Sequence, residues 1–490
     1  MAAGFFYSKT FKIIATVILS VELIIIITLK VVDLYCDEPG CWNKKDWGTN
    51  YCMEHINSIY EEAMKREGAY ENSQRKNSTS NSYSNKSQRS YSSGKKSTPS
   101  RSYNTYSNSY SSRRNDSYDV YNYGASLQAY ALQQYLINLG HQVEIINYQP
   151  DYLTRKYDYK WVNPESKLSR YALTRFVYRI MKYLQRKTTM GRKRVFDEFN
   201  HQVLKETATK YTSCDAICQN PPQADLYLVG SDQVWNIACP DADTAYYLDF
   251  VKEGKKIAYA VSTGATDIAK KANNPELYKK FVDNFDFISV REQNAVVQFK
   301  KMTGRNDIEL LIDPTLMFTQ EDWENHFTLN KPMVKGDYIF YYAFHYDDAV
   351  NKVVMEIANR MNMPVYIMEA KAWGPKGCHK SGLKLCENSG PEAFLNLMKF
   401  AKLSLTTSFH GTVFSVIFRK CFWFIDSSIH NPMDDRAATL VNQLGLQERL
   451  ILGETLLQQK VDVMPDYSQM NECIMALQSA AKAFLTRSLS

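Results

Sequence analysis

The chain has 490 residues, of which 44% are hydrophobic and 23% are charged, and its formal net charge is +7. That length is enough for about three domains, and the composition is ordinary for globular protein. Much of the modest positive charge falls in the polar N-terminal third, so we expect no nucleic-acid groove and no nucleic-acid partner. The seven cysteines that follow residue 200 are scattered, which is typical of reduced thiols in a cytosolic domain.

An apolar run from Phe11 to Val32 is close to the length that crosses a bilayer. Glu22 lies in its middle and is costly in lipid, but the surrounding Ile, Leu and Val residues compensate. Because no small-residue cleavage site follows, we expect residues 1–35 to be an uncleaved transmembrane anchor rather than a signal peptide. The chain would then be a single-pass membrane protein, attached through this N-terminal helix. The flanking lysines do not decide its orientation.

Residues 36–71 form a second segment, in which three cysteines and a histidine lie close together: Cys36, Cys41, Cys52 and His55. Three thiols and an imidazole could hold a zinc ion, although their spacing departs from the common finger patterns. One disulfide with a spare thiol is the alternative if this segment lies outside the membrane.

Residues 72–119 consist largely of Ser, Tyr, Asn, Lys and Arg, with almost no aliphatic side chains. Such a segment cannot bury enough apolar surface to fold, so we expect a disordered tether. Stacking of the interleaved Tyr and Arg on single-stranded nucleic acid is the less favoured alternative.

From Asn122 onward, strands and helices are expected to alternate. A helix at 124–139, a strand at 143–148 and a basic amphipathic helical stretch at 167–204 come first. Strands are then expected at 224–229, 256–261, 287–290 and 308–312, with helices at 275–285 and 294–302. A second set has strands at 338–344, 364–368, 403–410 and 422–425, and helices at 348–361, 391–401, 437–444 and 470–485.

This alternation predicts an α/β fold with parallel, doubly wound sheets. The polar segment 316–335 separates the two sets, so we expect an N-terminal α/β domain over 120–330 and a C-terminal one over 331–490. The last helix is expected to return and pack on either domain. A cleft between two such domains is the usual place for a small-molecule site.

Polar residues follow several of these strands, at the edge where open α/β sheets bind ligands. The block after the strand at 224–229 could bind hydroxyl groups, and its Trp offers a flat face to a sugar; it contains Gly230, Ser231, Asp232, Gln233, Trp235 and Asn236. A polar turn with the Trp anchored in the core is an equally good interpretation. Arg291, followed by Glu292 at the start of a helix, suits a phosphate or carboxylate, with a surface Arg–Glu pair as the alternative.

A lone histidine, His410, lies at the carboxyl end of the strand expected at 403–410, in the company of Ser408, Gly411 and Thr412. Imidazole is suited to proton transfer at neutral pH, and these neighbours favour a site over a buried core histidine. At the other end of the globular region, the first helix opens with Asn122, Tyr123 and Gly124, which could present backbone amides to an anion. They do not form a full dinucleotide-binding fingerprint.

Five blocks in this order resemble the polysaccharide pyruvyl transferase family over residues 122–450: Asn122-Tyr-Gly-Ala, Val229-Gly-Ser-Asp-Gln-Val-Trp-Asn, Ser289-Val-Arg-Glu, Asp313-Pro-Thr and Ser408-Phe-His-Gly-Thr. The resemblance implies two Rossmann-like domains facing a cleft, as in B-type glycosyltransferases. It implies transfer of pyruvate from phosphoenolpyruvate to sugar hydroxyls as a cyclic ketal, with no cofactor required. It further implies that His410 is the general acid/base and that Arg291 clamps the donor anion. The other residues named in the two preceding paragraphs, together with Arg436, are expected to bind donor or acceptor.

Two features depart from the family pattern. Many members carry Arg where this chain has Ser408, and losing a guanidinium removes a bidentate anion contact. Either another cation such as Arg436 substitutes, or the donor differs. The apolar strand that usually precedes the Asn-Tyr-Gly block is also missing, because residues 113–121 are polar.

The leading hypothesis is therefore a membrane-tethered, pyruvyl-transferase-like enzyme acting on a cell-envelope or capsular polysaccharide or its lipid-linked precursor. Because phosphoenolpyruvate is cytosolic, its catalytic domain should face the cytoplasm. One alternative is a glycosyltransferase that uses a nucleotide sugar. The other is a non-catalytic, anchored glycan-binding protein or a fused remnant.

Overall fold

The computed structural model describes residues 121–150, 155, 158–162, 169–184, 186–239, 242–374, 377–386, 390–426 and 435–490. The expected anchor, the Cys36–His55 segment, the tether and the strand sought before Asn122 all lie outside these residues. Within them, no helix has the length and apolar character that crossing a bilayer requires. The same residues contain no group of three or more side chains placed to hold a metal ion.

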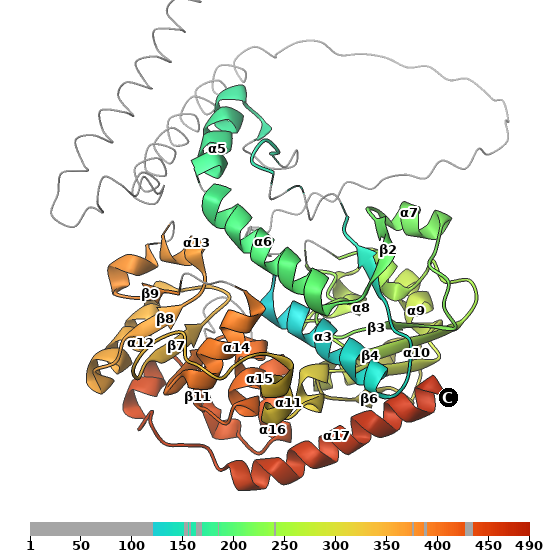
Figure 1. The fold of residues 1–490 in the computed structure, drawn as a ribbon. Helices are drawn as coiled ribbons and strands as arrows, with labels where there is room; N and C mark the ends of the chain where they lie inside the picture. The colour runs from blue at the N-terminus through green and yellow to red at the C-terminus, as the bar shows by residue number, and fades with distance from the viewer. Residues whose placement is uncertain are drawn as a thin grey trace, which may run out of the picture. The chain divides into compact units, whose positions relative to one another are not determined.

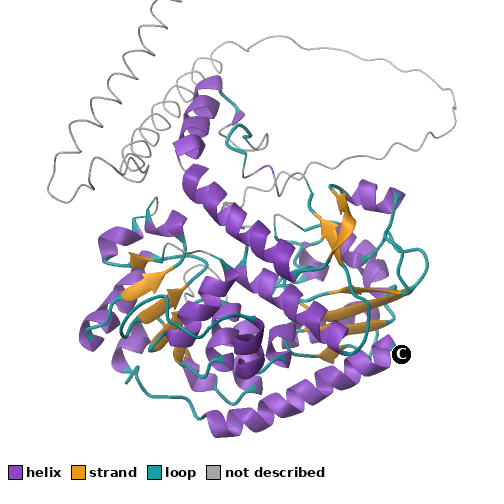
Figure 2. Cartoon of the chain, in the orientation of Figure 1, coloured by secondary structure: helices purple, strands orange, loops and turns teal. Residues whose placement is uncertain are grey.

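Two parallel sheets carry most of the fold (Figures 1 and 2), which confirms the predicted α/β class. The first sheet has the order β3 (Leu226–Val229), β4 (Lys255–Val261), β5 (Phe287–Val290) and β6 (Glu309–Leu310). The second has the order β12 (Leu450–Leu452), β11 (Cys421–Asp426), β10 (Leu403–Thr406), β7 (Ile339–Tyr342), β8 (Val365–Ile367) and β9 (Lys384–Leu385). Every recorded strand pair is parallel, so each sheet gathers its carboxyl ends along one edge.

The helices expected between these strands lie close to their predicted positions, and the structure adds helices at 214–219, 268–271, 320–326, 370–373 and 409–417 that were not expected. Those in the first half are α7 (Cys214–Gln219), α8 (Ile268–Lys271), α9 (Pro275–Asp283), α10 (Gln293–Thr303) and α11 (Gln320–His326). Those in the second half are α12 (Asp348–Met361), α13 (Ala370–Trp373), α14 (Pro391–Phe400), α15 (Phe409–Ile417), α16 (Asp435–Gln443) and α17 (Tyr467–Leu489). All strands of the first sheet precede residue 330 and all strands of the second follow it; the division into two domains there stays a prediction.

The first helix, α3 (Tyr123–Asn138), contacts the elements of the second sheet. Its Tyr123 ring stacks on Phe394 of α14 with centroids 5.4 Å apart, and meets Tyr342 at the end of β7 edge-on. The same hydrophobic cluster contains Leu127 of α3 and Tyr259 of β4, so it joins both sheets. The first turn of α3 is thereby fixed beside the carboxyl ends of the strands.

Three local differences from the expected elements have clear causes. The strand expected at 143–148 is β1 (Ile145–Tyr148), and it pairs with β2 (Glu206–Tyr211) in a separate two-stranded sheet. The polar sequence of β2 hid it from a search for apolar runs. The helical stretch expected at 167–204 consists of α5 (Ala172–Leu184) and α6 (Arg186–Val203).

The strand expected at 403–410 is too long, because β10 ends at Thr406. The Thr406 hydroxyl donates to the carbonyl of Tyr342 at 2.7 Å and accepts the amide of Ser408 at 3.0 Å, which turns the chain out of the strand. Helix α15 then begins at Phe409, so His410 lies in the first turn of a helix.

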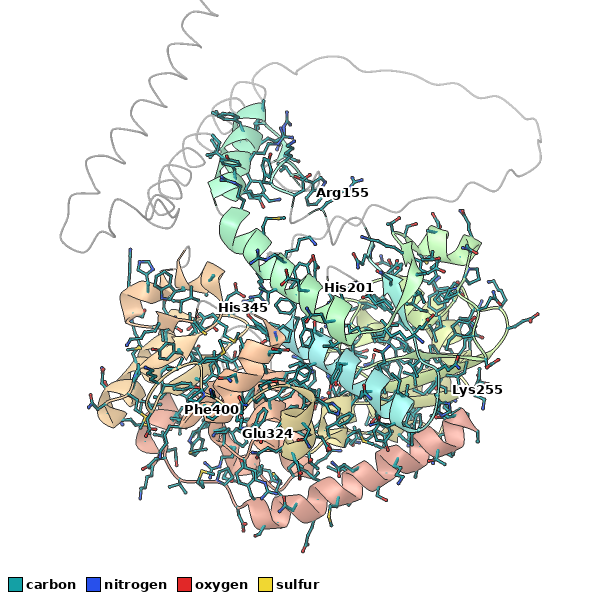
Figure 3. All side chains as sticks on the ribbon, in the orientation of Figure 1. Arg155, His201, Lys255, Glu324, His345 and Phe400 are labelled. Carbon is teal, nitrogen blue, oxygen red and sulfur yellow. The ribbon has the colours of Figure 1, made fainter. Side chains whose placement is uncertain are left out.

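The last helix, α17, packs on the first sheet, where Phe484 meets Tyr259 and Phe287 with ring centroids 6.2 and 6.3 Å apart. Its far end is held by Lys255, labelled in Figure 3, whose Nζ donates to the backbone oxygen of Ser490 at 2.6 Å. The first turn of α17 lies near the second sheet, because the Tyr467 hydroxyl donates to the carbonyl of Lys420.

Candidate active site

The carboxyl ends of both sheets meet in one buried group of charged and polar side chains, which we call the polar cluster: Ser231, Asp232, Arg291, Asp313 and His410. Ser231 and Asp232 follow β3, Arg291 follows β5, and Asp313 follows β6. His410 follows β10 of the other sheet. Two segments predicted separately, around residues 291 and 410, are therefore neighbours in space.

Arg291 occupies the centre of the polar cluster, with its side chain only 1% exposed. Its Nη1 donates to Oδ2 of Asp313 at 2.6 Å and its Nη2 to Oδ1 of Asp232 at 3.1 Å. The guanidinium also lies 4.2 Å from the centre of the Phe409 ring. Both terminal nitrogens are thus occupied by carboxylates, and only Nε lacks a hydrogen-bond partner among the described residues. These contacts disfavour the expected bidentate clamp on a donor anion.

Asp313 is the carboxylate that links Arg291 to His410. Its Oδ1 accepts from the amide and hydroxyl of Thr315 at 3.1 and 2.7 Å, while Oδ2 accepts from Arg291 and, at 3.2 Å, from Ser231. Burial alone would raise the pKa of Asp313. Interaction with His410, the charge of Arg291 and the bond from Thr315 outweigh burial and hold that pKa below its usual value. Asp313 is therefore a buried carboxylate that stays ionised at neutral pH.

The imidazole of His410 is held between Asp313 and α3. Its Nε2 lies 3.5 Å from Oδ2 of Asp313, an ion-pair distance when the ring is protonated. On its other side the ring lies against Gly124, where a Cβ atom would stand 2.0 Å from Nδ1. Gly124 is thus required by the close approach of the imidazole, and His410 as a whole is 3% exposed.

Glu292 and its neighbour Arg291 are both buried, so the two do not form a surface pair. Its Oε1 accepts from the Ser262 hydroxyl at 2.9 Å and from the Thr263 amide at 2.6 Å. Burial raises the pKa of Glu292 above its usual value, although the nearby charges of Arg291 and Arg436 oppose the shift. Arg436, in the first turn of α16, also helps to lower the pKa of Asp232, after Arg291 and His410 and against the effect of burial.

Four buried polar atoms in or beside the polar cluster lack a hydrogen-bond partner among the described residues: Nε of Arg291, Oε2 of Glu292, Oγ of Ser408 and Nε2 of His410. Buried polar atoms in native proteins are nearly always paired, so each unpaired one needs an explanation. Their concentration at the meeting of two sheet edges indicates a site that is completed by a ligand or by water.

The remaining predicted residues have structural partners. Asn122 caps α3 by accepting the amides of Gly124 and Ala125, so these amides are not open to an anion as expected. The hydroxyl of Tyr123 accepts a hydrogen bond from Arg192 at 3.2 Å. A Cβ at Gly230 would stand 1.9 Å from the carbonyl oxygen of Tyr259.

Two further predicted residues stabilise the first turn of α15. Gly411 packs so closely on Thr406 that a Cβ there would stand 2.0 Å from its hydroxyl oxygen. The hydroxyl of Thr412 donates to the carbonyl of Ser408 at 3.2 Å. Their proximity to His410 is therefore explained by local packing.

Trp235 needs a correction. The indole is fully buried, stacks on Tyr247 with centroids 5.1 Å apart, and donates from Nε1 to the carbonyl of Tyr246 at 3.0 Å. A small pocket beside the indole has a volume of about 60 Å³ and is also lined by Asp243, Thr244 and Tyr278. The structure supports the core anchor and not the expected sugar platform.

Nδ2 of Asn236 donates to Oε1 of Gln233 at 2.8 Å, and Oδ1 of Asn236 accepts from the Thr266 hydroxyl at 2.6 Å. These contacts use both amide atoms of Asn236 and the amide oxygen of Gln233, which were expected to bind hydroxyls. Asp313 shows the converse, because the sequence alone identifies it only as part of a family block and assigns it no role in a site. Its place shortly after the strand that ends at Leu310 was the available signal.

A family model described as polysaccharide pyruvyl transferase matches residues 122–429. The chain belongs to the polysaccharide pyruvyl transferase family. It is accordingly a transferase, and the matched residues include every member of the polar cluster. No curated protein matches the chain.

Solved structures with similar folds include the UDP-GlcNAc 2-epimerase from Neisseria meningitidis bound to UDP-GlcNAc, at 10% identity and TM-score 0.39, covering 75% of this pyruvyl transferase family chain and 97% of that one. The UDP-GlcNAc 2-epimerase from Methanocaldococcus jannaschii is similar at 13% identity and TM-score 0.38, covering 72% and 89%. A wall teichoic acid polymerase is similar at 11% identity and TM-score 0.30, covering 59% and 79%. These similarities are weak.

Proposed function

We propose that this chain transfers pyruvate from phosphoenolpyruvate to two hydroxyls of a cell-envelope or capsular polysaccharide, or of its lipid-linked precursor. Membership of the family supports the reaction class. The observation that carries the proposal is the group of unpaired buried atoms around the Asp313–His410 pair, where a proton-transferring imidazole and an anionic donor could meet.

The reaction balances without a metal or an organic cofactor. The methylene carbon of phosphoenolpyruvate gains a proton, two acceptor oxygens bond to the adjacent carbon, and the bond from that carbon to the phosphate oxygen breaks with its electron pair going to phosphate. Of the two protons that the hydroxyls release, one replaces the proton given to the methylene carbon and the other leaves with inorganic phosphate. One group that alternates between acid and base can carry these transfers.

His410 is the proposed proton carrier, and Asp313 the group that orients it and stabilises its protonated form. Arg291 acts through Asp313 and Asp232 rather than by a bidentate grip on the donor, because both of its terminal nitrogens are already bonded. The donor's phosphate and carboxylate would then be held by Nε of Arg291, by the Ser408 hydroxyl and by Arg436. These three groups would replace the anion contact that many family members make through an Arg at the position of Ser408.

The test is phosphate release from phosphoenolpyruvate in the presence of an acceptor glycan. We expect His410→Ala and Asp313→Asn each to lower the rate by about 10²- to 10⁴-fold, and the exposed His141→Ala, on the loop after α3, to leave it unchanged. A His410→Ala variant with the rate of the unchanged protein would overturn the assignment. Calorimetric binding of a nucleotide sugar, with no binding of phosphoenolpyruvate, would instead support the glycosyltransferase alternative.

The site of action follows from the donor. Because phosphoenolpyruvate is cytosolic, we propose that the catalytic part faces the cytoplasm and that residues 11–32 attach it to the membrane. Protease protection of the globular part in sealed right-side-out cells would support this orientation, and its digestion there would contradict it.

A further inference from the structure

Helix α5 presents an apolar stripe to solvent. Leu173, Phe176, Ile180 and Tyr183 are 57%, 52%, 39% and 45% exposed, and their spacing places them on one face of the helix. Figure 1 shows α5 at the end of α6 that lies away from α3 and the sheets. Single exposed apolar residues are scattered over most proteins and need no explanation. A contiguous exposed stripe, in contrast, marks an interaction surface.

The helical stretch that carries the stripe is basic, although Asp158 lies beside it, where its carbonyl accepts from Lys182. Between Glu165 and Asp197 the chain has ten Lys and Arg residues and no Asp or Glu. Arg175, Arg179 and Lys182 lie along one flank of the stripe on α5 itself. A basic amphipathic helix with an exposed apolar face is the pattern of a helix that lies in a membrane surface.

Aromatic side chains border the same surface. The Tyr183 ring meets the exposed Tyr159 edge-on at 5.5 Å, and the Arg186 guanidinium lies 3.6 Å from the centre of the Tyr183 ring. Phe176 and Tyr183 are the two aromatic side chains within the stripe. Tyrosines and arginines are favoured where the hydrocarbon of a bilayer meets its headgroups, because each has an apolar body and a polar end.

We propose that α5 is an interfacial anchor that inserts its apolar stripe into the surface of a bilayer rich in anionic lipid. With 13 residues, α5 is only about 20 Å long and cannot span the hydrocarbon. The exposed Arg179 then reaches phosphate headgroups while the stripe enters the acyl boundary. Arg175 and Lys182 add positive charge on the same flank, although each also donates to a backbone carbonyl, of Ser169 and of Asp158 respectively. The surface is distinct from the polar cluster, so this inference does not depend on the reaction proposed above.

Charge favours lipid over a segment of the chain itself as the occupant of this surface. Residues 1–120 have 16 Lys and Arg against 12 Asp and Glu, so that segment is also net positive and does not complement α5. A second copy of the chain would bring one acid-free basic stretch against another. An anionic bilayer complements both the apolar and the charged part of the surface.

The experiment measures amide hydrogen exchange of the full chain on vesicles, followed by mass spectrometry of peptides that cover 172–184. This readout reports on α5 whether or not the N-terminal segment also holds the chain to the vesicle. We expect exchange over 172–184 to be slower by at least about tenfold on vesicles of 70% phosphatidylcholine and 30% phosphatidylglycerol than on phosphatidylcholine alone. High salt should reverse the protection.

Two variants and two matched controls separate the causes. Phe176→Ser with Ile180→Ser, and Arg175→Glu with Arg179→Glu, should each abolish the dependence on phosphatidylglycerol, because the first pair removes insertion and the second reverses charge. The controls change residues exposed on other helices: Val297→Ser with Met475→Ser, and Lys300→Glu with Lys301→Glu. These controls should retain the full protection.

Equal exchange over 172–184 on the two kinds of vesicle would overturn the proposal, and so would protection that both α5 variants retain. Protection by a soluble polyanionic glycan in the absence of lipid would overturn it in favour of an acidic polysaccharide partner. A lipid-free dimer that the Phe176→Ser and Ile180→Ser changes dissociate would overturn it in favour of a second copy of the chain.

Discussion

The substitution Gly124→Ala tests the position of His410 without changing any titratable group. A Cβ at residue 124 would stand 2.0 Å from Nδ1, 2.2 Å from Cγ and 2.6 Å from Cε1 of the imidazole. Real Cβ atoms essentially never approach another heavy atom closer than 3.0 Å, so the ring must move by roughly 1 Å. That movement would alter the approach of Nε2 to Asp313, now 3.5 Å.

A misplacement of about 1 Å at a reacting group costs on the order of 100-fold in rate, or about 2.7 kcal/mol of activation free energy. We therefore expect the turnover number for phosphate release from phosphoenolpyruvate to fall about 100-fold. The free energy of unfolding should fall by about 1–3 kcal/mol from overpacking, less the gain of up to about 1 kcal/mol from replacing Gly within a helix.

The matched control is Gly191→Ala in α6, where a Cβ would meet nothing within 4 Å. That variant should keep its activity and gain about 0.5–1 kcal/mol in stability from helix propensity. Steady-state kinetics and urea denaturation of the two variants give the comparison. If Gly124→Ala turns over as fast as Gly191→Ala, the reasoning that places His410 at the reacting centre is refuted.

Three further substitutions test the buried charges of Arg291 and Glu292 and the structural role of Trp235. Arg291→Met should cost about 3–5 kcal/mol in urea denaturation, because it removes the guanidinium that neutralises the buried carboxylate of Asp313 and the half-buried one of Asp232; a loss below 1 kcal/mol would contradict this role of Arg291. Burial raises the folded-state pKa of Glu292, so its stabilising contribution is complete below its unfolded pKa of about 4.3 and is lost as pH rises through the folded value. Unfolding measured from pH 4 to 8 should show this decline in the unchanged protein and not in Glu292→Gln. Trp235→Ala should cost about 3–5 kcal/mol, whereas Trp235→Phe should leave the KM for the acceptor unchanged; a raised KM would restore the sugar platform.

Apolar periodicity was sufficient to predict most of the fold. The helix at 348–361 and the strand at 287–290 have the expected bounds, because their buried residues follow regular spacings. Strand β2 was not predicted because its sequence is polar. The strand before His410 was predicted to reach residue 410, whereas β10 ends at Thr406. Its end depends on a hydroxyl bond from Thr406 to another strand, which apolar spacing does not reveal.

The polar cluster could be predicted only in part. Their positions at the ends of predicted strands made Arg291 and His410 candidate site residues. Those positions could not show that the terminal nitrogens of Arg291 donate to Asp232 and Asp313. The sequence likewise left Trp235 equally suited to core and ligand. Such distinctions depend on which side chains meet across sequence distances of tens to hundreds of residues, and no local pattern encodes them.

The packing of α17 on the first sheet has a consequence for how the chain folds. Tyr259 and Phe287 are covered by Phe484, about 200 residues further along, so this contact pays a large loop-closure entropy and forms late. During synthesis the rings of Tyr259 and Phe287 therefore stay uncovered until α17 has emerged from the ribosome. A chain that stalls before residue 467 would expose an aromatic surface prone to aggregation, which makes this enzyme dependent on completing its last helix.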